Sequence, residues 1–313
     1  MYLDFILRSK YWKDYVNAIK GGSAQPGANA KQFAEFEFIL PILPEQQAIA
    51  SILTAIDDKI ELNLQQNKTL EEMAMALYKH WFVDFGPFKD GKFVDSELGM
   101  IPEGWEVKRF EELVDVKGGK RLPKGTQLST SKNSHPYIRV RDFGEIYLTE
   151  SGMEYVPDEV FNSISRYITN SGDVIMSIVG TIGEVSIVGK NLDNASLTEN
   201  CVKLILKDDQ VSSELLYLYL TSTKGVNDLK NSTVGSTQPK LPIYNIKSLT
   251  IAIPRDKNSI ENILNEINGV HQMIFNNTLE NQALNTLRDT LLPKLISGEV
   301  RVKDIKQTLD QAL

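Results

Sequence analysis

Two long heptad stretches constrain this chain more than any other feature. From Ile49 to Trp81, seam residues recur at alternating spacings of four and three, the pattern of a coiled-coil seam. The same seam recurs 214 residues later, from Ile263 to Leu295. Equivalent seam places carry asparagine in both copies: Asn63, Asn67, Asn277 and Asn281. The chain is therefore predicted to contain two long helices of related sequence.

The order of the segments favours an antiparallel pair of these helices within one chain. Both helices must reach the globular segment that lies between them in the sequence. If the two paired seams share a two-fold centre at their midpoints, Asn63 faces Asn281 and Asn67 faces Asn277. A buried seam asparagine lowers stability, and its best-attested use is to fix register and orientation. We expect a central polar layer; the alternative is that these asparagines are partly solvated and incidental. Arg288 interrupts the apolar seam, and its head is expected to extend towards solvent.

The repeat extends beyond the helices. At an offset of 213, residues 1–43 match the segment that ends at Pro254, including the Gly-rich loop Gly21–Pro26 against Gly235–Pro239. About 40 residues are too few for an independent core. The repeat unit is therefore interpreted as a globular domain followed by a helix, and its first copy is expected to lack most of the globular domain.

The predicted fold class is α+β: one globular mixed α/β domain plus two long antiparallel coiled-coil helices. Short β-rich runs and a helix capped at Ser212 indicate the mixed domain. The expected division is a remnant of a first domain at 1–43, a first helix at 44–82, a connector at 83–99, a complete globular domain at 100–255, a second helix at 256–298 and a tail at 299–313.

Composition excludes several classes of protein. The single cysteine, Cys201, excludes internal disulfides and cysteine-cluster metal sites, and the three histidines are far apart in sequence. No apolar run approaches ~20 residues, and the Met1 region lacks a signal-peptide layout. We expect a soluble cytoplasmic protein that binds no metal and no membrane.

A search for catalytic motifs finds none. There is no phosphate-binding Gly-rich loop, no dinucleotide fingerprint, no nucleophile elbow and no metalloprotease motif. Asp158 and Glu159 are interpreted as a helix start rather than part of a nuclease site. Asp173 and Glu184 are expected to be solvated structural carboxylates in hairpin turns. An enzyme with an unrecognised site remains an alternative.

Basic residues gather in two stretches although the formal net charge is −7. Residues 117–141 hold seven basic side chains and no acidic one, and residues 229–255 are also free of acid. Lys and Arg neutralise phosphates, while Gln, Ser and Arg reach base edges. The alternative is a solvated face. The predicted DNA-binding residues are Lys117, Lys120, Arg121, Lys124, Gln127, Lys132, Arg139, Arg141, Ser236, Thr237, Gln238 and Lys240.

Several sequence blocks, in this order, resemble type I restriction-modification specificity (S) subunits and their target-recognition domains. The resemblance covers essentially the whole chain, and the 213–214 repeat makes it specific. The blocks are the segment 41–49 with Pro41-Ile-Leu-Pro-Glu45, the opening 99–105, and the segments 136–142, 172–183, 195–200 and 235–241.

The resemblance implies two recognition domains held apart by two antiparallel helices, each reading one half of a split site in double-stranded DNA. Modification subunits would use S-adenosylmethionine to methylate adenine, and restriction subunits would use ATP and Mg²⁺ to translocate and cleave. The specificity subunit would itself carry no catalytic residue and bind no cofactor.

The sequence departs from this pattern because only 43 residues represent the first recognition domain. It is expected to be a truncated or alternatively started product, or a half-subunit whose copies exchange helices and bind a palindromic split site as a self-dimer. The competing interpretation is a free-standing or inactive DNA-binding or scaffold protein without a methylase partner.

Overall fold

The computed structural model describes residues 1–20 and 27–303. The chain divides into two compact units: unit 1 is Met1–Gln65 with Leu279–Leu313, and unit 2 is Gln66–Thr278. The Gly-rich loop that the sequence repeat places at 21–26, and most of the predicted tail, lie outside the described residues.

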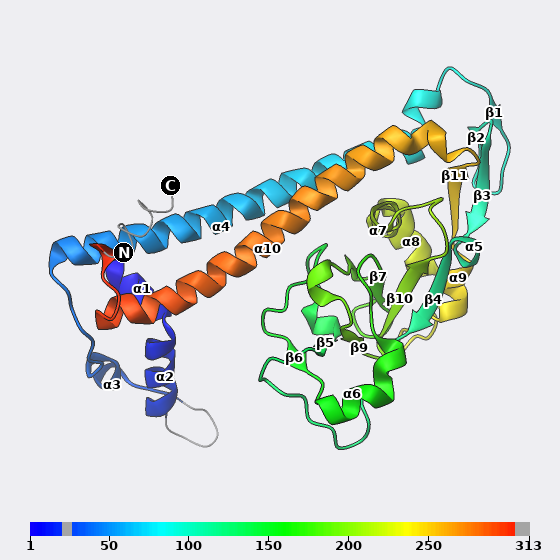
Figure 1. Ribbon diagram of the computed structural model, residues 1–313. Helices are drawn as coiled ribbons and strands as arrows, with labels where there is room; N and C mark the ends of the chain where they lie inside the picture. The colour runs from blue at the N-terminus through cyan, green and yellow to red at the C-terminus, as the bar shows by residue number, and fades with distance from the viewer. Residues whose placement is uncertain (21–26, 304–313) are drawn as a thin grey trace. The chain divides into compact units, whose positions relative to one another are not determined.

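Two long helices contribute to both units (Figure 1). Helix α4 spans Leu43–Tyr78, continues into a π-turn at Lys79–Val83, and carries Glu45 in its first turn. Helix α10 spans Glu261–Ser297 and follows a 3-10 turn at Lys257–Ile260, which is capped by the Asp256 side chain. The predicted fold class, a mixed α/β domain with two long antiparallel helices, is confirmed.

In unit 1 the two helices are held together by polar contacts. Asn63 Nδ2 donates to Asn281 Oδ1 at 2.9 Å, and both side chains are buried. Asn63 also donates to Glu280, which Lys59 contacts at 3.0 Å. Arg288 Nη1 lies 2.9 Å from Asp57 Oδ1 and Nη2 lies 3.1 Å from Asp289 Oδ1, and 29% of the Arg288 side chain is exposed. The guanidinium is thus partly exposed and pairs both with the facing helix and with its own helix.

In unit 2 a second pair of asparagines joins the two helices at the next seam position. Asn277 Nδ2 donates to Asn67 Oδ1 at 2.9 Å, and Asn67 Nδ2 lies 3.5 Å from Thr278 Oγ1. Asn67 and Thr278 are buried, whereas Asn277 is half-buried. The pairs 63–281 and 67–277 are those that the register of the two seams gives.

Unit 1 also contains the short helices α1 (Tyr2–Arg8), α2 (Lys10–Ile19) and α3 (Ala30–Ala34). Ser9 separates the first two, and its hydroxyl caps α2 by accepting from the Trp12 N–H at 3.2 Å. The unit's core is formed by Val302 and by apolar residues of α1 and of both long helices: Tyr2, Phe5, Ile6, Ile49, Ala50, Leu53, Leu292, Leu295 and Ile296.

Unit 2 is built on a four-stranded antiparallel sheet with the order β4-β10-β7-β8. Its strands are β4 (Val114–Gly118), β10 (Cys201–Leu206), β7 (Val174–Ser177) and β8 (Val185–Ile187). Leu204 of β10 stands opposite Val116 on one side and Val174 on the other. Helix α7 (Ser213–Thr221) lies against β7 and β8, and Ser212 caps it (Figure 1).

Smaller elements complete unit 2. A three-stranded sheet has the order β6-β5-β9, with β5 antiparallel to β6 and parallel to β9. Strand β3 pairs with β11, and β1 pairs with β2. The bounds are β1 Phe93–Val94, β2 Ile101–Pro102, β3 Trp105–Arg109, α5 Phe110–Leu113, β5 Pro136–Ile138, β6 Glu154–Tyr155, α6 Asp158–Ile164, β9 Ser196–Leu197, α8 Thr223–Asn231, α9 Ile243–Lys247 and β11 Thr250–Pro254.

The expectation that Asp173 is solvated is wrong. Only 4% of Asp173 is exposed, and its Oδ2 lies 3.6 Å from Lys203 Nζ, which is equally buried. The Asn170 N–H donates to the carboxylate at 2.8 Å, and Lys203 also donates to the Ile168 carbonyl. Burial raises the pKa of Asp173. Lys203 lies in β10 and Asp173 directly precedes β7, so the pairing of these two strands brings the two side chains together.

No helix among the described residues combines the length and apolarity needed to cross a membrane.

Candidate nucleic-acid interface

One edge of the four-stranded sheet gathers four connecting segments of unit 2. Because neighbouring strands are antiparallel, the end of β4, the start of β10, the end of β7 and the start of β8 meet at this edge. Gly118 there stands opposite Val202, and Cys201 stands opposite Ser177. We call this the loop edge, and it consists of residues 117–124, 177–184, 197–201 and 234–241.

The first basic loop leaves β4 and crosses the segment that enters β10. The Gly119 N–H donates to the Cys201 carbonyl at 2.9 Å, and the Lys120 N–H donates to the Leu197 carbonyl at 2.7 Å. A Cβ on Gly119 would lie 2.0 Å from the Thr198 carbonyl oxygen. Glycine is therefore required at this crossing, since any side chain would collide with backbone.

The second basic loop is a tight turn on the same edge. Val234 and Lys240 exchange backbone hydrogen bonds at 2.9 and 3.0 Å, and Gly235 adopts a φ of +92°. The Leu241 N–H donates to the Ile178 carbonyl at 2.9 Å, and the Ile178 N–H donates to the Asn200 carbonyl at 2.8 Å. The acid-free stretches 117–141 and 229–255 are thus connected by backbone hydrogen bonds through the segments around Ile178 and Cys201.

Most predicted contact residues on the loop edge present their side chains to solvent. Arg121 is 80% exposed and lies 2.5 Å from Glu199, while Lys120 Nζ lies 5.5 Å from the centroid of the Tyr167 ring. Lys117 lies 3.9 Å from Asp115. The remaining exposed members are Lys124, Ser236, Thr237, Gln238 and Lys240, and Gln127, which follows the first segment of the loop edge, is also exposed.

The loop edge contains two acidic residues, Glu184 and Glu199, and Glu199 lies beside Arg121. Burial is the largest influence and raises the pKa of Glu199, but hydrogen bonds from Arg121, Thr198 and the backbone, with the charge of Arg121, together outweigh burial and lower this pKa. Its side chain also lies within hydrogen-bond distance of Thr198 Oγ1, at 3.1 Å. An arriving phosphate would have to compete with this carboxylate for Arg121.

Lys132, Arg139 and Arg141 are paired with acidic residues around β5 and β6. Lys132 lies 2.6 Å from Glu150. Arg139 and Arg141 both contact Glu154, Arg141 at 2.7 Å, and the hydrogen bond from Arg139 lowers the pKa of Glu154. Arg139 is largely buried, with 20% of its side chain exposed. These acids follow the basic stretch in sequence, so a charge count within 117–141 could not detect them.

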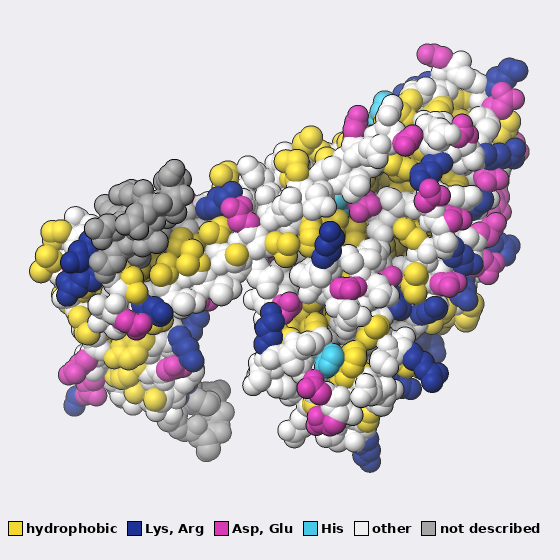
Figure 2. Space-filling model, viewed as in Figure 1, with side chains coloured by type: hydrophobic (Ala, Val, Ile, Leu, Met, Phe, Trp, Pro, Cys, Tyr) yellow, Lys and Arg dark blue, Asp and Glu magenta, His cyan; other side chains and the backbone are white. Residues whose placement is uncertain are grey.

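The distribution of charge over unit 2 reflects this pairing. In Figure 2, Lys and Arg atoms alternate with Asp and Glu atoms over the visible face of the unit. A broad basic surface of the kind that coats DNA is not visible on this face. Among the predicted DNA-binding residues, the basic side chains of the loop edge are exposed, whereas Arg139 is largely buried.

The described residues contain no cluster of three or more His, Cys, Asp or Glu side chains that could hold a metal ion. Cys201 is fully buried in β10, and burial raises the pKa of its thiol to about 12. His271 is also fully buried, between Tyr147 and Tyr217, and burial lowers its pKa to about 4. Both side chains are therefore neutral core residues near pH 7.

Comparison with known proteins identifies one family. Residues 2–72 and 102–287 match the family model described as the type I restriction modification DNA specificity domain. A type I restriction enzyme specificity subunit, MjaIX, from Methanocaldococcus jannaschii is 29% identical over 311 residues, which cover 97% of this chain and 70% of that protein. The HindI specificity subunit of Haemophilus influenzae is 27% identical, covering 83% of this chain and 68% of that protein.

A solved structure shares the fold. The type I restriction-modification S subunit from M. genitalium aligns with a TM-score of 0.56 at 15% identity, covering 94% of this chain and 72% of that one.

Proposed function

The chain belongs to the type I restriction-modification DNA specificity family, and from this premise we propose that the loop edge of unit 2 reads one half of a split DNA target. The chain's role is DNA recognition, without a catalytic step of its own. Recognition would combine phosphate neutralisation by the lysines and Arg121 with base contacts from the amide and hydroxyl side chains of the second loop.

One observation carries this proposal: backbone hydrogen bonds join the two acid-free loops at a single sheet edge. The bonds from Leu241 to Ile178 and from Ile178 to Asn200 connect the second loop to the segment that the first loop crosses. Sequence recognition in a DNA groove requires several protein contacts in fixed relative positions, because contacts to the phosphates set the register in which bases are read. Loops anchored to one rigid sheet meet that need, and flexible tails would not.

The set of residues proposed to contact DNA is smaller than the set predicted from the sequence. Lys120, Arg121, Lys124, Gln127, Ser236, Thr237, Gln238 and Lys240 make up the proposed contact set, with Lys117 at its margin. Lys132, Arg139 and Arg141 are proposed to stabilise the neighbouring three-stranded sheet through their ion pairs.

The proposed partners follow from family membership. Modification subunits would methylate adenine with S-adenosylmethionine, restriction subunits would use ATP and Mg²⁺, and this chain would bind none of these cofactors. Residues 100–255 would form the recognition domain, and the paired helices α4 and α10 would act as the spacer. Self-association through exchanged helices and a cytoplasmic location belong to the same proposal.

The test is a salt titration of duplex DNA binding. Removal of one phosphate contact reduces the slope of log K against log salt by about 0.9 for duplex DNA. Changing Lys120, Arg121 and Lys124 together to Ala should therefore reduce the slope by about 2 to 3 and weaken binding at low salt. Glu199→Gln should strengthen binding, because it frees Arg121 from its partner.

A matched control carries the same change in charge elsewhere. Lys10, Lys13 and Lys31 are exposed lysines of unit 1, and their combined change to Ala should leave the slope unaltered. If the unchanged chain and the loop variant gave equal slopes of log K against log salt, the first loop would not be part of the DNA interface.

A further inference from the structure

Arg121 and Glu199 form an ion pair on the loop edge of unit 2. The Nε atom of Arg121 donates to Glu199 Oε1 at 2.5 Å, although the two residues are 78 positions apart in sequence. The Arg121 side chain is 80% exposed, and that of Glu199 is 30% exposed. An ion pair this close to solvent contributes little to stability, so the fold itself does not require it.

Glu199 lies in a tight turn whose backbone is fixed by its neighbours. The Cys201 N–H donates to the Thr198 carbonyl at 3.1 Å and closes the turn. The Ile178 N–H donates to the Asn200 carbonyl at 2.8 Å and joins the turn to the segment that follows β7. The Glu199 carboxylate is therefore presented from a backbone held in a defined position, as a recognition site requires.

Arg121 extends from backbone that is attached to the same place. The N–H of Lys120, the residue directly before it, donates to the Leu197 carbonyl at 2.7 Å. Leu197 itself directly precedes the turn that carries Glu199. The two charged side chains thus start from anchored positions next to each other, and their pairing does not depend on a flexible loop.

The pairing uses one nitrogen of Arg121 and leaves the fork of its guanidinium available. Nε is the donor to Glu199, and among the described residues the terminal nitrogens Nη1 and Nη2 donate no hydrogen bond. Glu199 Oε2 accepts from the Thr198 hydroxyl at 3.1 Å, so a second contact orients the carboxylate. An exposed and oriented pair of donors is what bidentate recognition of two adjacent acceptors needs.

A carboxylate on a DNA-binding edge is unfavourable next to a phosphate, because the two negative charges repel. The major groove offers a better match in a G·C base pair. Guanine presents two adjacent acceptors, O6 and N7, and cytosine presents its N4 amino donor beside them. In an A·T pair the adenine N6 donor separates the N7 and O4 acceptors. Only the G·C pair therefore offers two adjacent acceptors to an arginine fork and a donor to a neighbouring carboxylate.

We infer that Arg121 and Glu199 together read one G·C base pair in the major groove. Nη1 and Nη2 of Arg121 donate to O6 and N7 of guanine. Glu199 is a positioning residue that holds the guanidinium through Nε, and its carboxylate faces the cytosine N4 amino group rather than a phosphate. The inference rests on the proposed function, because it requires that the loop edge faces DNA.

This role is compatible with a contribution of Arg121 to phosphate neutralisation. A positive charge in the groove displaces counterions whether its hydrogen bonds go to phosphates or to bases. The salt dependence of binding therefore does not distinguish the two roles. Base preference does, because phosphate contacts carry no direct sequence information.

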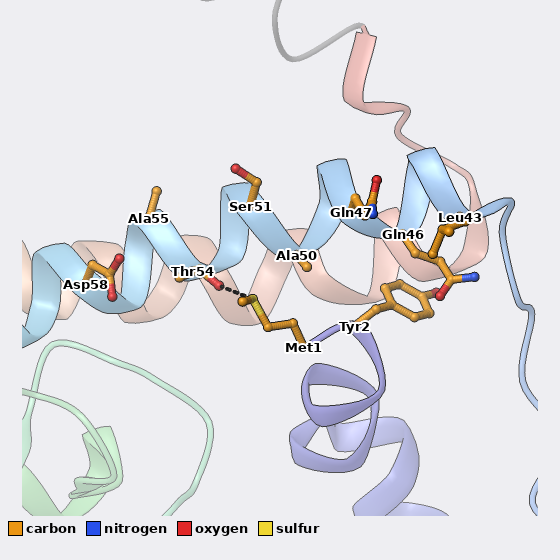
Figure 3. Close-up of a pocket in the computed structure, with 10 residues that line it drawn as sticks. All are labelled: Met1, Tyr2, Leu43, Gln46, Gln47, Ala50, Ser51, Thr54, Ala55 and Asp58. Carbon is orange, nitrogen blue, oxygen red and sulfur yellow. Dashed lines mark hydrogen bonds between the residues drawn. The ribbon is translucent and has the colours of Figure 1, made fainter.

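The pocket of unit 1 where Met1 and Tyr2 meet the start of α4 offers no comparable site (Figure 3). The hydrogen bond drawn there joins the Thr54 hydroxyl to the Met1 sulfur at 3.8 Å. The polar side chains of its lining are amides, hydroxyls and the carboxylate of Asp58, without a Lys or Arg side chain. Such a lining lacks the cationic donor that most often recognises guanine, so we place base reading in unit 2.

The test selects DNA from a library of duplexes that carry a randomised segment. The full chain binds the library, the bound duplexes are sequenced, and the preference at each position is compared between the original chain and its variants. Arg121→Lys keeps the positive charge but removes the planar fork that contacts two acceptors at once. Glu199→Gln keeps the size of the side chain but removes the charge that holds Arg121. Unfolding midpoints equal to that of the original chain verify that the variants fold.

The inference predicts one G·C position in the selected sequence whose preference falls by about 5- to 150-fold in Arg121→Lys. The other positions should stay as they were, and the slope of log K against log salt should not change, since the charge is retained. Glu199→Gln should weaken the preference at the same position while it strengthens binding to DNA of mixed sequence. The matched control is Lys124→Ala, an exposed lysine of the same loop, which should weaken binding to all sequences equally.

Three outcomes would overturn the inference. If Arg121→Lys selected the same sequence with the same preference, Arg121 would not read a base. If the preference fell equally at all positions, the pair would orient the loop rather than read one base pair. If the affected position were A·T, the assignment to guanine would be wrong. An original chain that selects no sequence would refute the proposed function as well, whereas in the three other cases the proposed function stands.

Discussion

Replacement of Asn63 by Leu should destabilise the helix pair of unit 1, although it adds an apolar side chain to a coiled-coil seam. Asn63 is fully buried and Asn281 is 8% exposed. The substitution removes the donor that lies 2.9 Å from Asn281 Oδ1, leaving a buried carbonyl oxygen without that bond. A buried acceptor deprived of its partner costs about 1–3 kcal/mol.

The double substitution Asn63→Leu with Asn281→Leu should reverse this destabilisation. A buried Leu contributes roughly 1.5–3 kcal/mol relative to an exposed one, while a hydrogen bond contributes about 0.5–1.5 kcal/mol net. The double variant is therefore expected to be at least as stable as the original chain. The coupling energy between the two sites should lie near the upper end of the range of about 0.5–3 kcal/mol for residues in contact.

Denaturant titration of the four chains, followed by circular dichroism at the helical band, measures the cycle. Leu64→Asn is the matched control, since Leu64 is 46% exposed on the same helix and should change stability by no more than about 0.5 kcal/mol. Solution scattering and mass measurement then show whether the helices still pair in one way. The double variant should populate more than one association state. Single variants as stable as the original chain, or a double variant with unchanged scattering and mass, would refute the role assigned to the asparagines.

Three further substitutions test the core and the first loop of unit 2. Lys203→Met leaves the Asp173 carboxylate buried without its cation and should cost about 3–5 kcal/mol at pH 7, measured by thermal or denaturant unfolding. Because the pKa of Asp173 is raised in the fold, part of that stability should return as the pH falls towards 4, and no recovery on acidification would contradict the assignment. His271 has a pKa of about 4 in the fold against 6.5 ordinarily, so the unfolded chain binds its proton more readily, and stability should decline by about 3 kcal/mol between pH 6.5 and 4. In His271→Phe this part of the decline should disappear from the pH profile, and an identical profile would exclude His271 as its source. Gly119→Ala should destabilise the first loop by more than about 2 kcal/mol and weaken DNA binding, because its Cβ meets the Thr198 carbonyl; a neutral effect would show that the crossing can open freely.

The heptad pattern made the helix pair predictable, because a seam is a local periodicity and two copies determine their own register. The pairs 63–281 and 67–277 follow from position alone. The helix after Ser212 was predictable for the same reason, since its cap lies within one turn of the sequence. The division into a remnant, a connector and a complete recognition domain remains a prediction.

The environment of charged residues was not predictable, because ion pairs join positions that are distant in sequence. Glu154 pairs with Arg139 and Arg141, and Glu150 pairs with Lys132. Both acids lie outside the acid-free stretch that contains these basic residues. Asp173 is buried because β7 and β10 place Lys203 beside it. Equally, only the strand order brings the loops around Lys120 and Gln238 to one edge.

Methylation mapping of the full chain reconstituted with a modification subunit and S-adenosylmethionine tests the central claim most directly. The account predicts adenine methylation confined to one DNA sequence, and it predicts that this methylation disappears when Lys120, Arg121 and Lys124 are changed to Ala. Methylation without sequence preference, or a complex that forms but modifies no defined site, would contradict it.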